Sequence, residues 1–380
     1  MKQHRKILVA MSGGVDSSVA AALLKESGYE VAGATIRTWA SGQCADLNTR
    51  ACCGLSGVED ARDVADSLGI PYWVFNFEEE FKKHVVDIFA GEYLRGRTPN
   101  PCLSCNEHIK FRLFLQRARQ LGYDAVATGH YAQMGYDYET SSYYICQGRD
   151  AAKDQSYVLF PLEQELLQNL LLPVGGFTKS EIRDKAKALG LRVWGKPDSQ
   201  EICFIPSNRY GEFLQREFMN GETKPGVIRH KSGKILGEHE GYYHYTRGQR
   251  RGLGVANSER LYVIRTDPQT NEVFVGNKED ILGRSFRVSR VNWFLPPGGG
   301  GPILADVRIR SQHKAASAEL FLLESGDVKV VFEEPQEAIT PGQGVAFYRG
   351  QGVIGGGWVE EVWDDETVEE AIEADAGDKE

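Results

Sequence analysis

The chain has 380 residues, 41% of them hydrophobic and 26% charged, which is typical of a soluble globular protein. This composition excludes wholesale disorder and collagen-like or coiled-coil architectures, and the length suits two or three domains. No apolar run in the sequence approaches the roughly 20 residues that a membrane-spanning helix needs, and residues 1–10 do not resemble a signal peptide. We therefore expect a cytoplasmic protein with no membrane partner.

The charge is distributed unevenly. The formal net charge is −9, but residues 364–380 hold nine acids against Lys379, which leaves only −1 for the rest of the chain. A near-neutral body can carry a basic face, so nucleic acid is not excluded as a partner. We expect the acidic tail to be a disordered or frayed helical extension.

The first 200 residues alternate strand and helix patterns. Strands are predicted at residues 6–11, 29–36, 72–77 and 123–128, and helices at residues 17–27, 58–68, 81–95 and 111–121. A capping box that begins at Thr178 opens a further helix, which extends to about residue 189. This order predicts a parallel sheet with helices on both faces.

After about residue 210 the pattern changes to short alternating runs separated by turns, which is typical of small β domains. We therefore predict an α/β nucleotide-binding domain over residues 1–208 and a β-rich central domain over residues 209–282. A β-barrel over residues 283–363 and the acidic tail complete the chain.

The strongest motif lies at the end of the first predicted strand. It consists of a strand end, a Ser-Gly-Gly turn and a helix start, namely Ala10, Met11, Ser12, Gly13, Gly14, Val15, Asp16 and Ser17. Glycines let the backbone N–H groups point inward, and a helix N-terminus adds partial positive charge, so such a loop binds phosphates. It lacks the GK[ST] ending of a Walker loop. It resembles the PP-loop of the ATP pyrophosphatases, and an ordinary turn capped by Ser and Asp is the alternative.

The seven cysteines are Cys44, Cys52, Cys53, Cys102, Cys105, Cys146 and Cys203. In a reducing cytosol, clustered cysteines point to metal binding or catalysis rather than to disulfides. Cys102 and Cys105 have CxxC spacing after a Pro-stiffened segment, beside a helix that we expect to begin near Asn106. This spacing alone does not separate redox, zinc and iron–sulfur uses from a buried structural pair. Cys203, taken alone, reads as a core residue more readily than as a catalytic one.

Six motifs in order give the chain a family resemblance. They are SGGVDSSV, GRTPNP followed by CN, ATGHYA, KDQSYVLF, DSQEICF and YTRGQRRGLG, and they lie within residues 5–360. With these motifs the chain resembles the bacterial tRNA-uridine 2-sulfurtransferases, the 2-thiouridylases of the MnmA/TrmU family. The basic loop at residues 245–251 also suits RNA phosphates, although solvated arginines on a barrel turn are the alternative.

The resemblance implies a reaction and its partners. ATP with Mg²⁺ would bind residues 10–17, with Asp16 orienting the metal and the backbone of Ile36 and Gly129 holding the adenosine. The family adenylates the C2 oxygen of the wobble uridine, and a persulfide sulfur then displaces AMP. By motif position, Cys203 would carry a persulfide received from a cysteine desulfurase or a relay protein. Cys105 matches the family's nucleophilic cysteine, which would release the sulfur from Cys203 or attack the persulfide and leave a Cys105–Cys203 disulfide. The tRNA contacts of the family fall on Asn100, Pro101, Cys102, Lys153, Asp154, Gln155, Arg310 and Ser311.

One departure opens an alternative. Many family members have Asp where this chain has Cys102, so Cys102, Cys105 and Cys203 could instead hold a [4Fe–4S] cluster. Two rival functions also remain at this point: a small-molecule PP-loop ligase, such as a GMP or argininosuccinate synthetase, and a non-catalytic RNA-binding or iron–sulfur protein. The roles of Cys44, Cys52 and Cys53 stay open between redox and packing.

Overall fold

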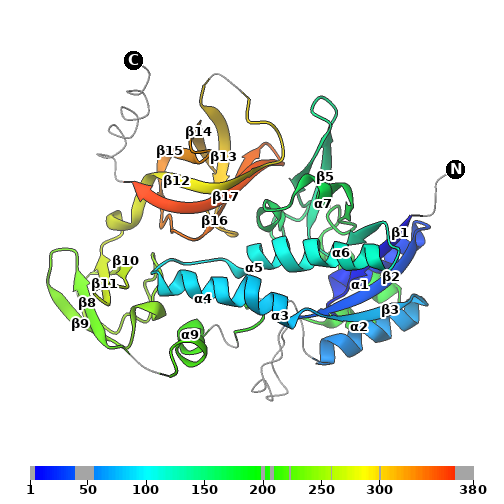
Figure 1. Ribbon diagram of the computed structural model, residues 1–380, viewed down its shortest axis with the longest axis horizontal. Helices are drawn as coiled ribbons and strands as arrows, with labels where there is room; N and C mark the ends of the chain where they lie inside the picture. The colour runs from blue at the N-terminus through cyan, green and yellow to red at the C-terminus, as the bar shows by residue number, and fades with distance from the viewer. Residues whose placement is uncertain are drawn as a thin grey trace.

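The computed structural model describes residues 5–38, 55–197, 202–205, 209–221, 224–257, 259–298 and 301–363. The predicted acidic tail and the cysteines at positions 44, 52 and 53 lie outside these residues. The described residues form a five-stranded, a four-stranded and an eight-stranded sheet (Figure 1). None of the described helices is both long and apolar enough to cross a membrane.

The five-stranded sheet is parallel throughout, as predicted. Its order is β3-β2-β1-β4-β7. The strands are β1 (Lys6–Ala10), β2 (Glu30–Arg37), β3 (Tyr72–Asn76), β4 (Ala125–Ala127) and β7 (Leu170–Leu171). Ile7 and Val9 enter one apolar cluster while Leu8 enters another, so both faces of the sheet are covered.

Helices from different parts of the chain cover the two faces. One apolar cluster packs the helices α1 (Val15–Glu26), α2 (Leu55–Leu68) and α8 (Lys179–Ala188) against the sheet. The other packs two helical runs, α3 (Glu78–Phe81) with η1 (Lys82–Val86) and α4 (Asp87–Leu94), and α5 (Pro101–Ser104) with η2 (Cys105–Leu113) and α6 (Phe114–Gln120). Shorter helices are η3 (Ser156–Leu159), α7 (Gln164–Gln168) and η4 (Arg192–Gly195).

The helix that carries the CxxC cysteines begins earlier than expected. The sequence analysis places its start near Asn106, but the helical run starts at Pro101. The Asn100 side chain accepts a hydrogen bond from the Cys102 backbone N–H at 3.0 Å, and Pro101 occupies the first helical position. Asn at the N-cap and Pro at the first position are a favourable helix start. Cys102 and Cys105 therefore both lie on helical backbone, not on an extended segment.

The central region is a small mixed sheet in the order β10-β11-β8-β9, in which β11 and β8 run parallel. Its elements are α9 (Tyr210–Phe218), β8 (Gly226–His230), β9 (Ile235–His239), η6 (Tyr242–His244), β10 (Tyr262–Asp267), β11 (Glu272–Gly276) and η7 (Glu279–Ile281).

The last six strands close into the predicted barrel. They are β12 (Leu282–Trp293), β13 (Ile303–Arg308), β14 (Ala316–Leu322), β15 (Val328–Glu337), β16 (Gly344–Arg349) and β17 (Gly352–Trp363). Antiparallel pairing of β12 with β17 closes the ring around its own apolar core. The predicted fold class is confirmed, whereas the domain limits at residues 208 and 282 stay predictions.

A hairpin that the sequence patterns did not predict joins the first domain to the barrel. Strands β5 (Ala132–Asp137) and β6 (Ser142–Gln147) pair with each other, and β6 also pairs with β17. The contact is short, with Cys146 opposite Gly352 and Ile145 opposite Val353. Parts of the α/β domain and of the barrel thus share one continuous sheet.

A short segment between α4 and α5 ties all three sheets together. The Arg97 guanidinium contacts Glu360 of β17 through two N–O pairs, at 2.7 and 3.1 Å, and Glu92 of α4 at 2.7 Å. The Thr98 N–H donates to the Pro341 carbonyl at 2.9 Å, and Gly96 accepts from the Thr266 hydroxyl of β10 at 3.2 Å. Residues 92–98, which we call the junction segment, therefore contact both β domains.

Replacing Arg97, the cation shared by Glu92 and Glu360, should lower the stability of the protein. In Arg97→Ala, Glu92 and Glu360 lose their shared partner while they stay largely buried, so we expect a loss of about 2–4 kcal/mol of stability. The matched control is the neighbouring Arg95→Ala, because the Arg95 side chain is 75% exposed and should contribute less than about 0.5 kcal/mol. Urea unfolding of both variants checks this, and equal midpoints would show that the ion pair contributes nothing.

Candidate functional site

The loop between β1 and α1 has the geometry that phosphate binding needs. Gly13 adopts a φ of +71°, and a Cβ there would overlap the Gly57 backbone, so only glycine suits this position. Helix α1 begins directly after its N-cap residue Gly14, which has no side chain with which to cap the helix. The first N–H groups of a helix have no acceptor within it, so they give the loop a positive end.

The serines of this loop brace it from within. The Ser17 hydroxyl accepts from the Ser12 N–H at 3.2 Å and donates to the Gly14 carbonyl at 3.3 Å. The Ser18 hydroxyl donates to the same carbonyl at 2.9 Å, and both hydroxyl-bearing residues are buried. These two serines therefore fix the shape of the turn, whereas Ser12 is exposed.

The loop lies where the strand order of the sheet reverses. Successive strands run outward from β1 through β2 to β3 on one side, while β4 lies on the other. In open α/β sheets, ligands bind at such a switch point, at the carboxyl ends of the strands. Ile36 lies near the end of β2, and Gly129 lies shortly after the end of β4. Gly129 also packs directly on the start of α1, because a Cβ there would overlap the backbone of Asp16 and Ser17. The predicted nucleotide-site residues are therefore gathered at one edge of the sheet.

Asp16 is held by two partners that the sequence analysis did not identify. The Lys179 ammonium donates to both carboxylate oxygens at 2.8 Å, and the Tyr131 hydroxyl donates to one of them at 2.7 Å. Lys179 opens α8, where its backbone N–H donates to Asp150 at 2.9 Å. The Asp16 side chain is still 30% exposed, so a hard cation could share this carboxylate.

A second lysine supports the same loop. The Lys196 ammonium donates to the Gly13 carbonyl at 3.0 Å and to Asp60 of α2 at 2.5 Å. Lys196 belongs to the KPDSQEICF stretch that leads to Cys203, so it links that stretch to the loop. In the sequence, Lys179 directly follows the predicted capping residue Thr178, and Lys196 precedes the DSQEICF motif. Neither position indicates which residue the lysine contacts.

The predicted cysteine pair shares one apolar cluster. Cys105 is a buried member of this cluster, and the half-buried Cys203 packs against it. Phe204 anchors the second cysteine, because its ring contacts Phe81 and Phe89 with centroids 5.6 and 5.5 Å away. Cys102 is exposed instead.

The proposed cluster ligands do not form a metal-binding group. Within the part of the chain that the structure describes, which includes Cys102, Cys105 and Cys203, no three His, Cys, Asp or Glu side chains could hold a metal ion together. The arrangement therefore lends no support to a [4Fe–4S] cluster on these three cysteines.

Asn106 places an unsatisfied acceptor beside Cys105. Its amide nitrogen donates to the Val158 carbonyl at 2.9 Å, whereas its buried Oδ1 has no hydrogen-bond partner among the described residues. Cys105 and Asn106 open the π-helical segment η2, and such segments occur frequently at functional sites. Orphaned buried acceptors are uncommon and call for an explanation, so Asn106 joins the candidate site.

The side chains of the predicted tRNA-contacting residues differ in accessibility. Burial raises the pKa of the Tyr157 hydroxyl, whereas the charge of Arg310 and a hydrogen bond with Asn100 lower it. Arg310 of the barrel and Asn100, which caps the helix that carries Cys102 and Cys105, thus act on the same hydroxyl. Arg310 and Ser311 are exposed, Pro101 is buried, and Lys153 is half-buried.

Two of the predicted contact residues have structural side chains. Asp154 is only 3% exposed and receives a hydrogen bond from Arg308 of β13 at 2.6 Å. The Gln155 side-chain oxygen accepts from the Tyr131 N–H at 2.9 Å. The side chains of Asp154 and Gln155 are engaged in hydrogen bonds within the protein, so RNA would contact the backbone at these positions.

Comparison with known proteins assigns the chain to a family. A tRNA methyl transferase HUP domain model matches residues 5–207, a tRNA methyl transferase PRC-barrel domain model residues 211–277, and an aminomethyltransferase beta-barrel domain model residues 283–359. The chain is 46% identical over 357 residues to the tRNA-specific 2-thiouridylase MnmA of Acetivibrio thermocellus, covering 94% of this chain and 99% of the relative. It is 48% identical over 362 residues to that of Carboxydothermus hydrogenoformans, covering 94% and 98%.

The chain belongs to the tRNA-specific 2-thiouridylase family. The resemblance carried by the six motifs is thereby confirmed. Among solved structures, a 4-thiouridine synthetase–RNA complex with bound ATP is similar at 20% identity and a TM-score of 0.36, covering 57% of this chain and 51% of that one. A similarity this weak adds nothing to the assignment.

A buried histidine beside the nucleotide-site glycine should make stability depend on pH. Burial, with a smaller effect of Lys110, lowers the pKa of His130 to about 3, and its Nδ1 lies 2.8 Å from the Thr128 hydroxyl. Below pH 6.5 the unfolded chain takes up a proton that the folded chain refuses, so stability falls as the pH falls from about 6.5 towards 3.

The change that isolates this effect is His130→Gln. Between pH 7 and pH 5, the wild type should lose about 2 kcal/mol more stability than the variant. Urea unfolding at both pH values measures this difference, and the pH 7 data supply the control for any pH-independent cost of the substitution. Parallel pH dependences of the two proteins would contradict the assignment of a neutral, buried imidazole.

Proposed function

We propose that the chain catalyses ATP-dependent 2-thiolation of the wobble uridine of tRNA, releasing AMP and pyrophosphate. The observation that carries the proposal is the uncapped Ser-Gly-Gly turn at the sheet switch point, in the same domain as two cysteines that share one cluster. The named activity of the curated relatives supports the substrate class. The family models bear methyl transferase names, but methyl transfer has no use for a phosphate-binding turn in a domain that also holds two cysteines of one apolar cluster.

In the first step the chain would activate the base. The N-terminus of α1 and the backbone of residues 10–17 would hold the ATP phosphates, and the backbone at Ile36 and Gly129 the adenosine. Asp16 offers a partly exposed carboxylate that suits Mg²⁺, which would neutralise phosphate charge. The uridine C2 oxygen attacks the α-phosphorus, and pyrophosphate leaves.

In the second step sulfur replaces the activated oxygen. Cys203 would carry a persulfide supplied by a cysteine desulfurase or a relay protein. Its outer sulfur attacks C2, and AMP departs with the original oxygen. The Cys105 thiolate attacks the inner sulfur of Cys203, which breaks the S–S bond to the new 2-thiouridine and leaves a Cys105–Cys203 disulfide. An external thiol reductant must then restore both thiols. This chemistry belongs in the reducing cytoplasm, where tRNA is found.

The tRNA would contact residues on both sides of the cysteine helix. The start of that helix, Asn100–Cys102, would approach the target base, and the exposed Arg310 and Ser311 would meet the RNA backbone. Lys153 would add a charge from the neighbouring loop, while Asp154 and Gln155 shape that loop.

Substitution of the two cysteines should separate the two steps. In Cys105→Ser and Cys203→Ser, 2-thiouridine formation should fall to background while tRNA-dependent pyrophosphate release continues, because the phosphate loop is untouched. Cys146→Ser is the control, since Cys146 lies on β6 outside this cluster, and it should thiolate normally. Full thiolation by either serine variant would contradict sulfur transfer through Cys105 and Cys203.

Anaerobically purified wild-type protein decides between the persulfide route and the iron–sulfur cluster route. Protein purified without oxygen is assayed for iron, acid-labile sulfide and tRNA thiolation. Iron-free protein that thiolates tRNA from a persulfide donor supports the relay. Activity that follows about four irons per chain would assign the three cysteines to a [4Fe–4S] cluster instead.

Lys179 should matter for nucleotide use. Its ammonium neutralises Asp16 at the phosphate loop, so in Lys179→Met the carboxylate would repel the phosphates. We expect kcat/KM for ATP to fall roughly 10- to 100-fold, the equivalent of a charged hydrogen bond of about 1.5–3 kcal/mol. Pyrophosphate release at varied ATP measures it, Lys179→Arg should recover part of the loss, and Lys187→Met, an exposed change on the same helix, is the control. Unchanged kinetics in Lys179→Met would remove this lysine from the site.

A further inference from the structure

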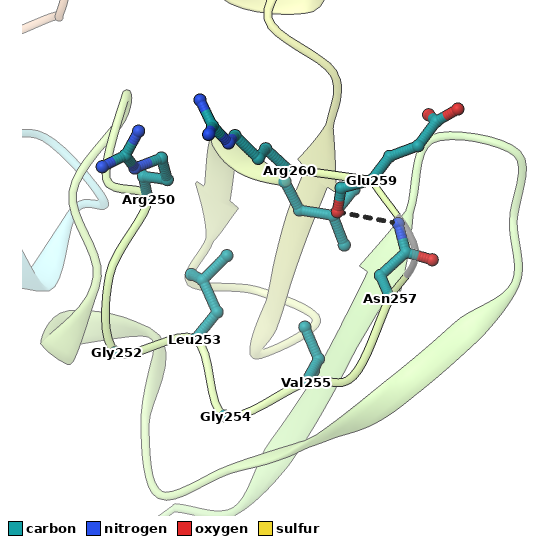
Figure 2. Close-up of a pocket in the computed structure, with 9 residues that line it drawn as sticks. Arg250, Gly252, Leu253, Gly254, Val255, Asn257, Glu259 and Arg260 are labelled. Carbon is teal, nitrogen blue, oxygen red and sulfur yellow. Dashed lines mark hydrogen bonds between the residues drawn. The ribbon is translucent and has the colours of Figure 1, made fainter.

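The central region holds a cavity that none of the proposed steps uses. A cavity of about 370 Å³ opens in the loop between η6 and β10. It is lined by Arg250, Gly252, Leu253, Gly254, Val255, Asn257, Glu259, Arg260 and Leu261 (Figure 2). Volumes of this order are typical of small-molecule sites and exceed what a single inorganic ion fills.

The loop around this cavity is held in shape. The Gly248 N–H donates to the Val263 carbonyl at 2.8 Å, and the Val263 N–H returns a bond to Gln249 at 2.9 Å. The Gln249 side chain also bonds to the backbone of Thr246 and Arg251, at 3.1 and 3.0 Å. These bonds attach the start of the cavity loop, around Arg250, to β10.

Positive charge lies on one side of the cavity. Figure 2 shows the guanidinium groups of Arg250 and Arg260 on the same side of it, while the Glu259 carboxylate points away. Both arginines are exposed, and neither forms an ion pair with any residue that the structure describes. By contrast, Arg229 of the same sheet is neutralised by Glu272. Two uncompensated guanidinium groups at one rim suit a phosphate.

Apolar side chains form only a small part of the cavity lining, and the rest of it is polar. Leu253 and Leu261 are buried, at 6% and 5% exposure, and Val255 is half-buried beside them. A ligand that fills the cavity would thus combine an anionic group at the rim with a larger body that meets both the polar lining and its small apolar part. A nucleotide has this composition, whereas a bare phosphate would leave most of the cavity empty.

We propose that this cavity binds one unstacked nucleotide of the tRNA, with its phosphate between Arg250 and Arg260 and its nucleoside over Leu253 and Leu261. This inference rests on the proposed function, because it takes tRNA as the substrate. The cavity loop leads into β10 of the central sheet, which Figure 1 shows far from β1, so RNA bound there would be held away from the reacting base. It therefore contributes to affinity and register rather than to chemistry.

The test compares two charge-matched double variants. The first variant, Arg250→Ala with Arg260→Ala, removes both guanidinium groups from the cavity rim. The control, Lys224→Ala with Lys234→Ala, removes two exposed cations elsewhere in the central region. Binding of a fluorescently labelled, unmodified tRNA transcript is followed by anisotropy across a salt series. Thermal melting of each variant checks that it folds.

We expect the arginine variant to bind about tenfold more weakly, with a salt slope smaller by about one, as for a lost phosphate contact. The control should change far less. The KM for tRNA should rise while kcat stays near that of the wild type, a split that a folding defect would not produce. Arg250→Lys with Arg260→Lys keeps the charge and should recover part of the affinity.

If both double variants lost the same tRNA affinity, the loss would reflect total charge alone, and the proposed nucleotide site would be wrong. Wild-type affinity in the arginine variant would also overturn it, while leaving the proposed function intact. A wild-type protein that fails to bind the transcript would overturn both proposals.

Discussion

The Arg97 guanidinium holds together the parts of the molecule on which the candidate site depends. It contacts Glu92, on helix α4 at the start of the junction segment, and Glu360, on the final barrel strand. The Arg97 hydrogen bond lowers the pKa of Glu360, so this pair stays charged at neutral pH. Three residues later the chain caps the cysteine helix with Asn100. The position of Cys105 relative to the barrel is therefore set by an ion pair rather than by apolar packing alone.

Two lysines extend the same principle to the nucleotide side. Lys179 neutralises Asp16, and Lys196 connects the Gly13 carbonyl with Asp60. Each brings a helix or a following segment against the loop between β1 and α1. Lys196 also lies shortly before Cys203 in the sequence, so the lysine that braces this loop belongs to the stretch that we propose carries the sulfur.

Local sequence signals predicted the parallel sheet, the phosphate turn and the start of α8, because strand periodicity, glycine and a capping box act within a few residues. They did not predict pairs formed across the chain. Lys179 lies 163 positions from Asp16, and Arg308 lies 154 positions from Asp154, so nothing local marks these partners. The start of the cysteine helix was misplaced for another reason. Pro101 was taken to stiffen an extended segment, whereas after Asn100 it initiates a helix.

The pairing of β6 with β17 has a consequence for how the domains can be separated. Strand β6 has β5 on one side and the last barrel strand on the other. A shortened chain that ended before the barrel would leave the N–H and C=O groups of this edge without their partner strand. Bare edges of this kind recruit strands from other molecules and lead to aggregation. The α/β domain and the barrel are therefore interdependent in solubility, and the first is better studied with the second attached.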